Sequence, residues 1–92
     1  MIRSFRHKGL RLFFSTGSTR GILFAHVKRL KLILALLNVA STSAHLDAPG
    51  LRLHPLRGRY DGFWAVHVSG NWRVIFRYEE GHVHDVDYLD YH

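Results

Sequence analysis

The sequence predicts an α+β fold in which two N-terminal helices pack on one face of an antiparallel sheet. Apolar residues recur every three or four positions in residues 24–40, which is typical of a helix. They alternate with polar residues in residues 63–78, which is typical of strands. The chain has 92 residues, and a chain of that length buries only about two-thirds of its unfolded surface, so we expect one domain spanning residues 1–92.

The first helix is expected to begin near Lys8, because Leu10, Phe13 and Phe14 have helical spacing. Gly17 should end it, since glycine readily adopts the left-handed conformation that closes a helix. The preceding residues 2–5 form a short apolar run that can pair as an edge strand.

The second helix is predicted over residues 24–40 and should lie across the apolar face of the sheet. Its apolar run is interrupted by Lys31 and Asn38 and is far shorter than the roughly 20 residues that a membrane span needs, so we expect no membrane partner. The apolar stripe that should face the sheet consists of Phe24, Val27, Leu30, Leu34 and Leu37.

The remaining elements are predicted as strands and turns. Leu51–His54 alternates in polarity, and Pro55 should end that strand because proline has no amide hydrogen for the ladder. A basic turn covers residues 57–62, a second turn covers residues 79–81, and residues 82–89 form the final strand.

Residues 63–78 are predicted as a β-hairpin with its loop at residues 69–71. A three-residue loop places His67, Arg73 and Arg77 on one face, whereas a two-residue loop would mix the faces, so we favour the longer loop. The opposite, apolar face would then hold Trp64, Val66, Val68, Trp72, Val74 and Phe76.

Thirteen Lys and Arg residues against seven Asp and Glu give a net charge of +6. The charge is uneven, because residues 1–46 hold eight of the basic residues and no acidic one. Such a field favours nucleic acid, an anionic membrane or an acidic protein, and composition does not choose among them. Cysteine is absent, which excludes disulfides and thiolate metal sites and makes a cytoplasmic location the default.

Several polar residues do not fit a core and can converge on one sheet face or its rim. Their side chains supply the groups that RNA cleavage requires: a base for the 2′-hydroxyl proton, an acid for the leaving 5′-oxygen, and cations for the phosphorane. This chemistry requires no cofactor. The candidates are His54, Arg57, Arg73, Asp90, Tyr91 and His92.

Simpler interpretations of these residues stay open. His54 can cap a strand edge, and Arg77 is interpreted as a solvated cation. A non-catalytic RNA- or ribosome-binding protein would use the same basic surface, although it would gain little from the Asp-Tyr-His sequence at residues 90–92.

A metal site is a further alternative. His82 and His84 share a strand face, where a third ligand such as His92 or Asp90 could join them. Paired histidines on strands often occur by chance, and no glutamate base or cysteine accompanies them. We therefore expect no metal.

Three segments resemble a known family: residues 53–58 (LHPLRG), residues 71–73 (NWR) and residues 87–92 (DYLDYH). They resemble the HigB toxins of the RelE superfamily, which are ribosome-dependent mRNA endonucleases of toxin–antitoxin systems. The resemblance is strong over residues 51–92, and residues 5–10 also look like the opening of the family. It implies a RelE-like microbial RNase fold whose curved sheet holds mRNA in the ribosomal A site.

The resemblance also implies roles for the candidate residues. Mapped by position, it makes His54 and residues 90–92 (Asp90, Tyr91 and His92) necessary for metal-independent mRNA cleavage, with Arg57 and Arg73 contacting phosphate. Position 57 is commonly lysine in the family, and Arg57 keeps the charge but excludes a neutral-amine role.

The expected partners follow from the same resemblance. They are the ribosome, mRNA and a cognate HigA-like antitoxin with a helix-turn-helix, and the toxin would reach operator DNA only through that antitoxin. The acid-free first half predicts that the antitoxin docks on the helical, basic side.

Overall fold

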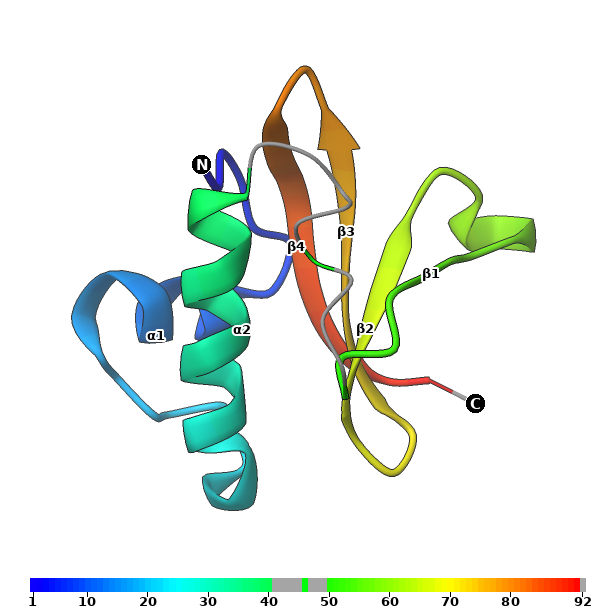
Figure 1. Cartoon of the computed structure of the whole chain (residues 1–92). Helices are drawn as coiled ribbons and strands as arrows, with labels where there is room; N and C mark the ends of the chain where they lie inside the picture. The colour runs from blue at the N-terminus through cyan, green and yellow to red at the C-terminus, as the bar shows by residue number, and fades with distance from the viewer. Residues whose placement is uncertain (41–45, 47–49, 92) are drawn as a thin grey trace.

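A computed structural model describes residues 1–40, 46 and 50–91, and Figure 1 shows their arrangement. These residues form an α+β fold with a four-stranded antiparallel sheet, which confirms the predicted class. The expectation of two N-terminal helices was incomplete, because a 3₁₀ helix and two bridges to the sheet also occur there. In chain order the elements are α1 (Lys8–Thr16), η1 (Phe24–His26), α2 (Val27–Val39), β1 (His54–Pro55), η3 (Gly58–Tyr60), β2 (Trp64–Ser69), β3 (Trp72–Glu79) and β4 (His82–Asp90).

The strands of the described sheet follow chain order, β1-β2-β3-β4, so β1 and β4 are its edges. Ile2 and Phe5 make isolated parallel bridges to Val83 and Val86 of β4. The edge strand expected at residues 2–5 is therefore reduced to two bridges. They occupy backbone groups that an open edge would expose.

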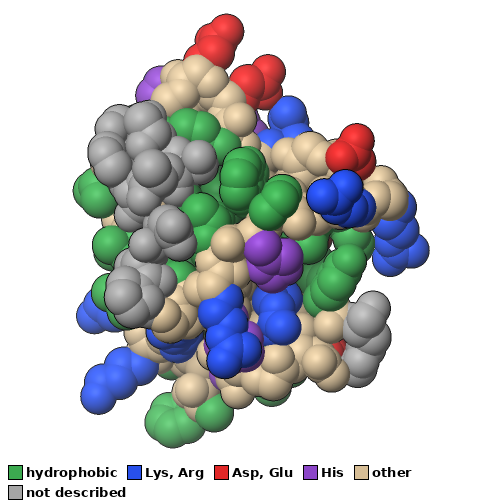
Figure 2. Space-filling view, turned by 45° about the vertical axis from the view of Figure 1, so that its right-hand side comes forward, with side chains coloured by type: hydrophobic (Ala, Val, Ile, Leu, Met, Phe, Trp, Pro, Cys, Tyr) green, Lys and Arg blue, Asp and Glu red, His purple; other side chains and the backbone are tan. Residues whose placement is uncertain are grey.

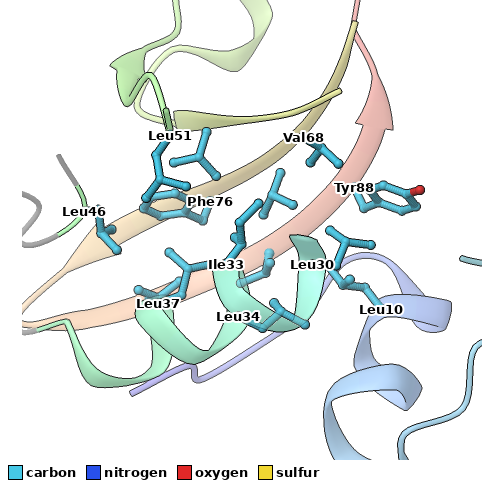
Figure 3. Packing of buried hydrophobic residues seen from close by; sticks show 14 of the residues in the cluster. Leu10, Leu30, Ile33, Leu34, Leu37, Leu46, Leu51, Val68, Phe76 and Tyr88 are labelled. Atoms are coloured by element: carbon cyan, nitrogen blue, oxygen red, sulfur yellow. The ribbon is translucent and has the colours of Figure 1, made fainter. Parts of the chain in front are cut away.

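The main core lies between α2 and one face of the sheet (Figure 1). Figure 3 shows side chains of α2 pointing toward those of the strands, with Phe76 among them. Leu30 and Phe76 are fully buried, and burying a side chain of this size contributes about 1.5–3 kcal/mol. The predicted packing of the second helix on the apolar sheet face is confirmed.

The first helix ends as predicted. Gly17 has a φ of 80° and its N–H donates to the Phe13 carbonyl, which is the left-handed closure that glycine adopts without steric cost. At the other end, Nδ1 of His7 accepts from the N–H of Leu10.

The second helix begins later than predicted. Phe24–His26 form the 3₁₀ turn η1, which has three residues per turn rather than 3.6. Phe24 therefore leaves the apolar stripe and is 90% exposed, so its expected core position was wrong, while His26 is buried. No helix in the described part of the chain has the length and apolar character to cross a membrane.

The strand predicted over Leu51–His54 was wrong. Arg52 has a φ of 53°, which interrupts the extended backbone, and β1 consists of His54 and Pro55 alone. Proline is tolerated because β1 is an edge strand.

The β2–β3 hairpin has the predicted faces but a different loop. Ser69 pairs with Trp72, so only Gly70 and Asn71 lie between the paired residues, and the register shifts by one between His67 and Ser69. Because of this bulge, the apolar side chains of both strands lie on one face of the sheet, whereas a two-residue loop without a bulge would place them on different faces. The predicted apolar set accordingly belongs to the main core.

The β3–β4 connection agrees with the prediction. Glu80 and Gly81 have φ values of 50° and 77°, which is the pattern of a two-residue hairpin turn of type I′. β4 continues to Asp90, one residue past the expected end.

Candidate active site

The candidate residues lie on or beside the sheet face opposite α2. His54 pairs with Ala65, and Ala65 pairs with Ile75, so these side chains share one row. His67 and Arg73 pair in a second row. The two rows are about 7 Å apart, because a strand rises about 3.3 Å per residue.

A small apolar cluster supports the rim of this face. Its buried members are Leu56, from the segment that joins β1 to β2, Ala65 of β2 and Ile75 of β3. The sequence pattern indicated only a polar face here and missed this cluster. The partly buried residues that pack against it are Tyr60, Phe63, Leu89 and Tyr91.

An open hollow of about 500 Å³ adjoins this cluster at the C-terminal end of β4. Arg57, Asp90 and Tyr91 line it, so three of the six predicted site residues meet there. Leu89 forms part of the wall. The hollow combines a guanidinium, a carboxylate and a phenol, which is half of the predicted set.

Two further residues line the hollow and were treated by sequence reasoning only as parts of a turn. Arg59 and Tyr60 belong to η3. The Arg59 guanidinium lies 5.2 Å from the centre of the Tyr60 ring, and that ring lies 5.9 Å from the ring of Tyr91. The sequence Arg-Gly-Arg-Tyr carried a usable signal, because cations interleaved with aromatics are typical of single-stranded nucleic-acid sites.

His54 is exposed on β1 and does not line the hollow; it pairs with Ala65, a member of the small apolar cluster. Its Nδ1 is 2.8 Å from the carbonyl oxygen of Arg52. Because a carbonyl only accepts, Nδ1 carries the hydrogen, and Nε2 of the neutral ring keeps a lone pair. The local backbone therefore selects the tautomer that can accept a proton at Nε2.

Arg73 lies in the second row and is held by the hairpin. Its Nη1 donates to the Gly70 carbonyl at 2.7 Å and to the Trp72 carbonyl at 3.0 Å, and it lies 3.0 Å from Nδ1 of His67. The structure thus places Arg73 on the predicted face, but not in the hollow.

A buried pair fixes the end of β4 beneath Asp90. The Tyr88 oxygen lies 2.6 Å from Nδ1 of His26, which is 5% exposed. The backbone of Leu23 also hydrogen-bonds to Tyr88, and burial raises the pKa of the phenol. Further along, the N–H of Tyr91 donates to the Asn71 carbonyl at 2.8 Å.

The predicted position of His92 in the site lies outside the described residues and stays a prediction. The metal alternative that uses Asp90 is excluded by geometry, because His82 and Asp90 are the two ends of β4, about 26 Å apart at the usual strand rise. Across residues 1–40, 46 and 50–91, no three His, Cys, Asp or Glu side chains form a group that could hold a metal ion.

Fold and site together define a class: an α+β protein with an open sheet face, cationic and aromatic at its rim, suited to the phosphates and bases of a single nucleic-acid strand. Residues 3–92 match the family described as "RelE-like toxin of type II toxin-antitoxin system HigB". A curated relative, "Endoribonuclease HigB" of Proteus vulgaris, is 38% identical over 92 residues, covering 100% of both chains. The chain belongs to the HigB family of RelE-like toxins of type II toxin–antitoxin systems.

Proposed function

We propose that this toxin is a ribosome-dependent endoribonuclease that cuts mRNA in the ribosomal A site and so inhibits translation. The observation that carries the proposal is the meeting of Arg57, Asp90 and Tyr91 in one open hollow, next to the apolar cluster whose member Ala65 pairs with His54. The Proteus vulgaris relative is named as an endoribonuclease, which supports the same reaction class.

His54 is assigned the role of general base. Its Nδ1–H is bound to the Arg52 carbonyl, so Nε2 accepts the proton of the 2′-hydroxyl. The 2′-oxygen then attacks phosphorus, the bond to the 5′-oxygen breaks, and the products carry a 2′,3′-cyclic phosphate and a 5′-hydroxyl once the leaving oxygen is protonated.

The hollow supplies the remaining groups. Arg57 and Arg59, which line the hollow, would donate to the phosphorane, whose negative charge grows during the attack. Tyr91 offers a ring on which a base can stack and a hydroxyl that can donate. His92 remains the predicted acid or phosphate contact.

Ribosome dependence is supported by charge. The net charge of +6 and the acid-free residues 1–46 suit ribosomal RNA phosphates. Binding of this kind releases counterions, so the affinity for ribosomes should fall steeply with salt.

The helical side is the proposed docking site for a HigA-like helix-turn-helix antitoxin. A groove between α1 and α2 is lined by Phe13, Phe14, Val27 and Leu34, with Lys31 at its edge. An acidic, partly apolar segment of the antitoxin would complement it. Docking there leaves the hollow open, because α2 and the hollow lie on opposite faces of the sheet.

Primer extension after brief induction tests the proposal. New mRNA ends should appear at a fixed position within codons and vanish when ribosomes are cleared from the message. A non-catalytic inhibitor that binds RNA or the ribosome would arrest synthesis without new 5′ ends, and that result would refute the proposal.

A further inference from the structure

His67 is surrounded by three arginines from three segments of the chain. Its N–H donates to the Leu51 carbonyl at 2.7 Å, and its own carbonyl accepts from Nε and Nη2 of Arg29 on α2, at 3.2 and 2.9 Å. Its ring Nδ1 lies 3.0 Å from Nη1 of Arg73. Arg52, in the segment before β1, is close enough to act on the ring electrostatically. Backbone hydrogen bonds therefore hold His67 in a position where its imidazole is close to guanidinium groups.

The surroundings of the His67 ring favour its neutral form. Burial lowers the pKa of His67 most, and the charges of Arg73, Arg52 and Arg29 lower it further. Neutrality is what allows Nδ1 to accept from Arg73. The guanidiniums around this uncharged ring repel one another, which costs folding stability. A bound anion would offset that repulsion, so the arrangement is suited to anion binding.

The three cations differ in what they can do. Arg29 is occupied by backbone carbonyls, because it also donates to Gly50 at 2.6 Å, so it orients the strand. Arg52 is exposed and Arg73 is half-buried. Figure 2, which brings the β1 and β2 side forward, shows Lys and Arg side chains gathered beside histidines on this face.

We propose that Arg52, His67 and Arg73 form a second phosphate subsite, which binds an RNA phosphodiester next to the one that is cut. The inference rests on the proposed function, which places the RNA strand along this face. The subsite lies one row, about 7 Å, from the row of His54. Both guanidiniums can donate to the phosphate oxygens, and the hairpin carbonyls keep Arg73 aimed at them.

A bound phosphate also changes the proton balance of His67. Its negative charge offsets the guanidiniums and raises the pKa of the ring, and the imidazolium then donates to the phosphate instead of accepting from Arg73. RNA binding is thus coupled to the uptake of one proton, and affinity rises as pH falls. Each pKa unit between the free and the bound ring corresponds to about a tenfold change in affinity.

The test follows the histidine rings of the full-length toxin by NMR across the neutral pH range. The probe is an RNA made of 2′-O-methyl nucleotides, which lacks the attacking hydroxyl and cannot be cut. The pKa of His67 should rise when this RNA binds, whereas the ring resonances of His84, at the other end of the same sheet, should stay where they are. An unchanged His67 pKa in RNA-bound wild-type toxin overturns the proposal, whatever the variants do.

Two variants separate proton uptake from simple positioning. His67→Asn keeps an acceptor for Arg73 but cannot titrate, so it should bind RNA with an affinity that no longer depends on pH. His67→Leu should weaken binding about tenfold at low pH, where the wild-type imidazolium makes a charge-assisted contact, and progressively less as pH rises. His84→Asn is the matched control and should behave like wild type. Full pH dependence in His67→Asn would contradict the proposal.

Separate arms identify the source of the phosphate. Inorganic phosphate, or vacant ribosomes without mRNA, should shift the His67 resonance less than the RNA does, and an equal shift would overturn the assignment to an RNA strand. A shift with RNA but no mRNA cleavage would refute the proposed function alone. Cleavage without the shift would refute only the second subsite.

Discussion

Replacing His54 with alanine should separate catalysis from folding. The side chain is exposed on an edge strand, and the contact it loses is the hydrogen bond to the Arg52 carbonyl. An exposed bond of this kind contributes at most about 1 kcal/mol. The loss of a general base lowers the rate by roughly 10²–10⁴-fold, which is about 3–5 kcal/mol of transition-state stabilisation. Activity should therefore fall far more than stability.

The assay is single-turnover cleavage of mRNA on programmed ribosomes, with thermal melting measured on the same preparations. His84→Ala is a suitable control, because it removes an imidazole from the same sheet face at the far end of β4. A His54→Ala toxin that cuts mRNA at a rate within a few-fold of wild type would show that His54 is not the general base. The hydrogen bond from Nδ1 of His54 to the Arg52 carbonyl would then play no part in cleavage.

Three other perturbations test separate parts of the structure. The pKa of Asp85 lies below its ordinary 3.8, mainly because Arg77 donates a hydrogen bond to the carboxylate. The stabilisation that this ion pair gives the fold is therefore fully present above pH 3.8 and is lost as pH falls through the lower pKa of the folded state. Asp85→Asn should flatten the acid side of a plot of melting temperature against pH, and only slightly lower stability at neutral pH because the pair is partly exposed; an unchanged acid side would contradict the reasoning. Tyr88→Phe leaves the buried Nδ1 of His26 without its partner and should cost about 1–3 kcal/mol in urea unfolding, whereas a cost below measurement error would dismiss the pair as an anchor of β4. Phe14→Asp, at a groove side chain that is 40% exposed, should weaken binding of the cognate antitoxin by more than about 1 kcal/mol in calorimetry without changing mRNA cleavage, and an unaltered dissociation constant would move the docking site elsewhere.

Elements with strong local signals were predictable from sequence. The closure of α1 at Gly17 depends on backbone freedom at a single glycine, and the turn at Glu80-Gly81 depends on two neighbouring residues. Such features need no knowledge of distant contacts.

Features set by distant contacts were missed. The left-handed backbone at Arg52 and the acceptance of Pro55 in a strand depend on where the sheet ends. The exposure of Phe24 depends on a 3₁₀ turn whose period differs from the helix that follows it. The spacing of apolar residues predicts which side chains share a helix face only where the number of residues per turn stays the same.

The site was predictable by residue type more than by arrangement. Chemistry and family resemblance indicated Arg57, Asp90 and Tyr91, and the structure gathers them in one hollow. Arg59 and Tyr60 join them only because η3 brings the turn against β4. A turn read by itself does not reveal which strand it will contact.

The chemistry of the RNA ends made on purified ribosomes tests the central claim most directly. With an mRNA codon in an empty A site, we expect one cut at that codon, with a 2′,3′-cyclic phosphate on the upstream fragment and a 5′-hydroxyl on the downstream fragment. The cut should disappear when a tRNA fills the A site. Fragments with 5′-phosphate ends, or equal cleavage with the A site filled, would contradict it.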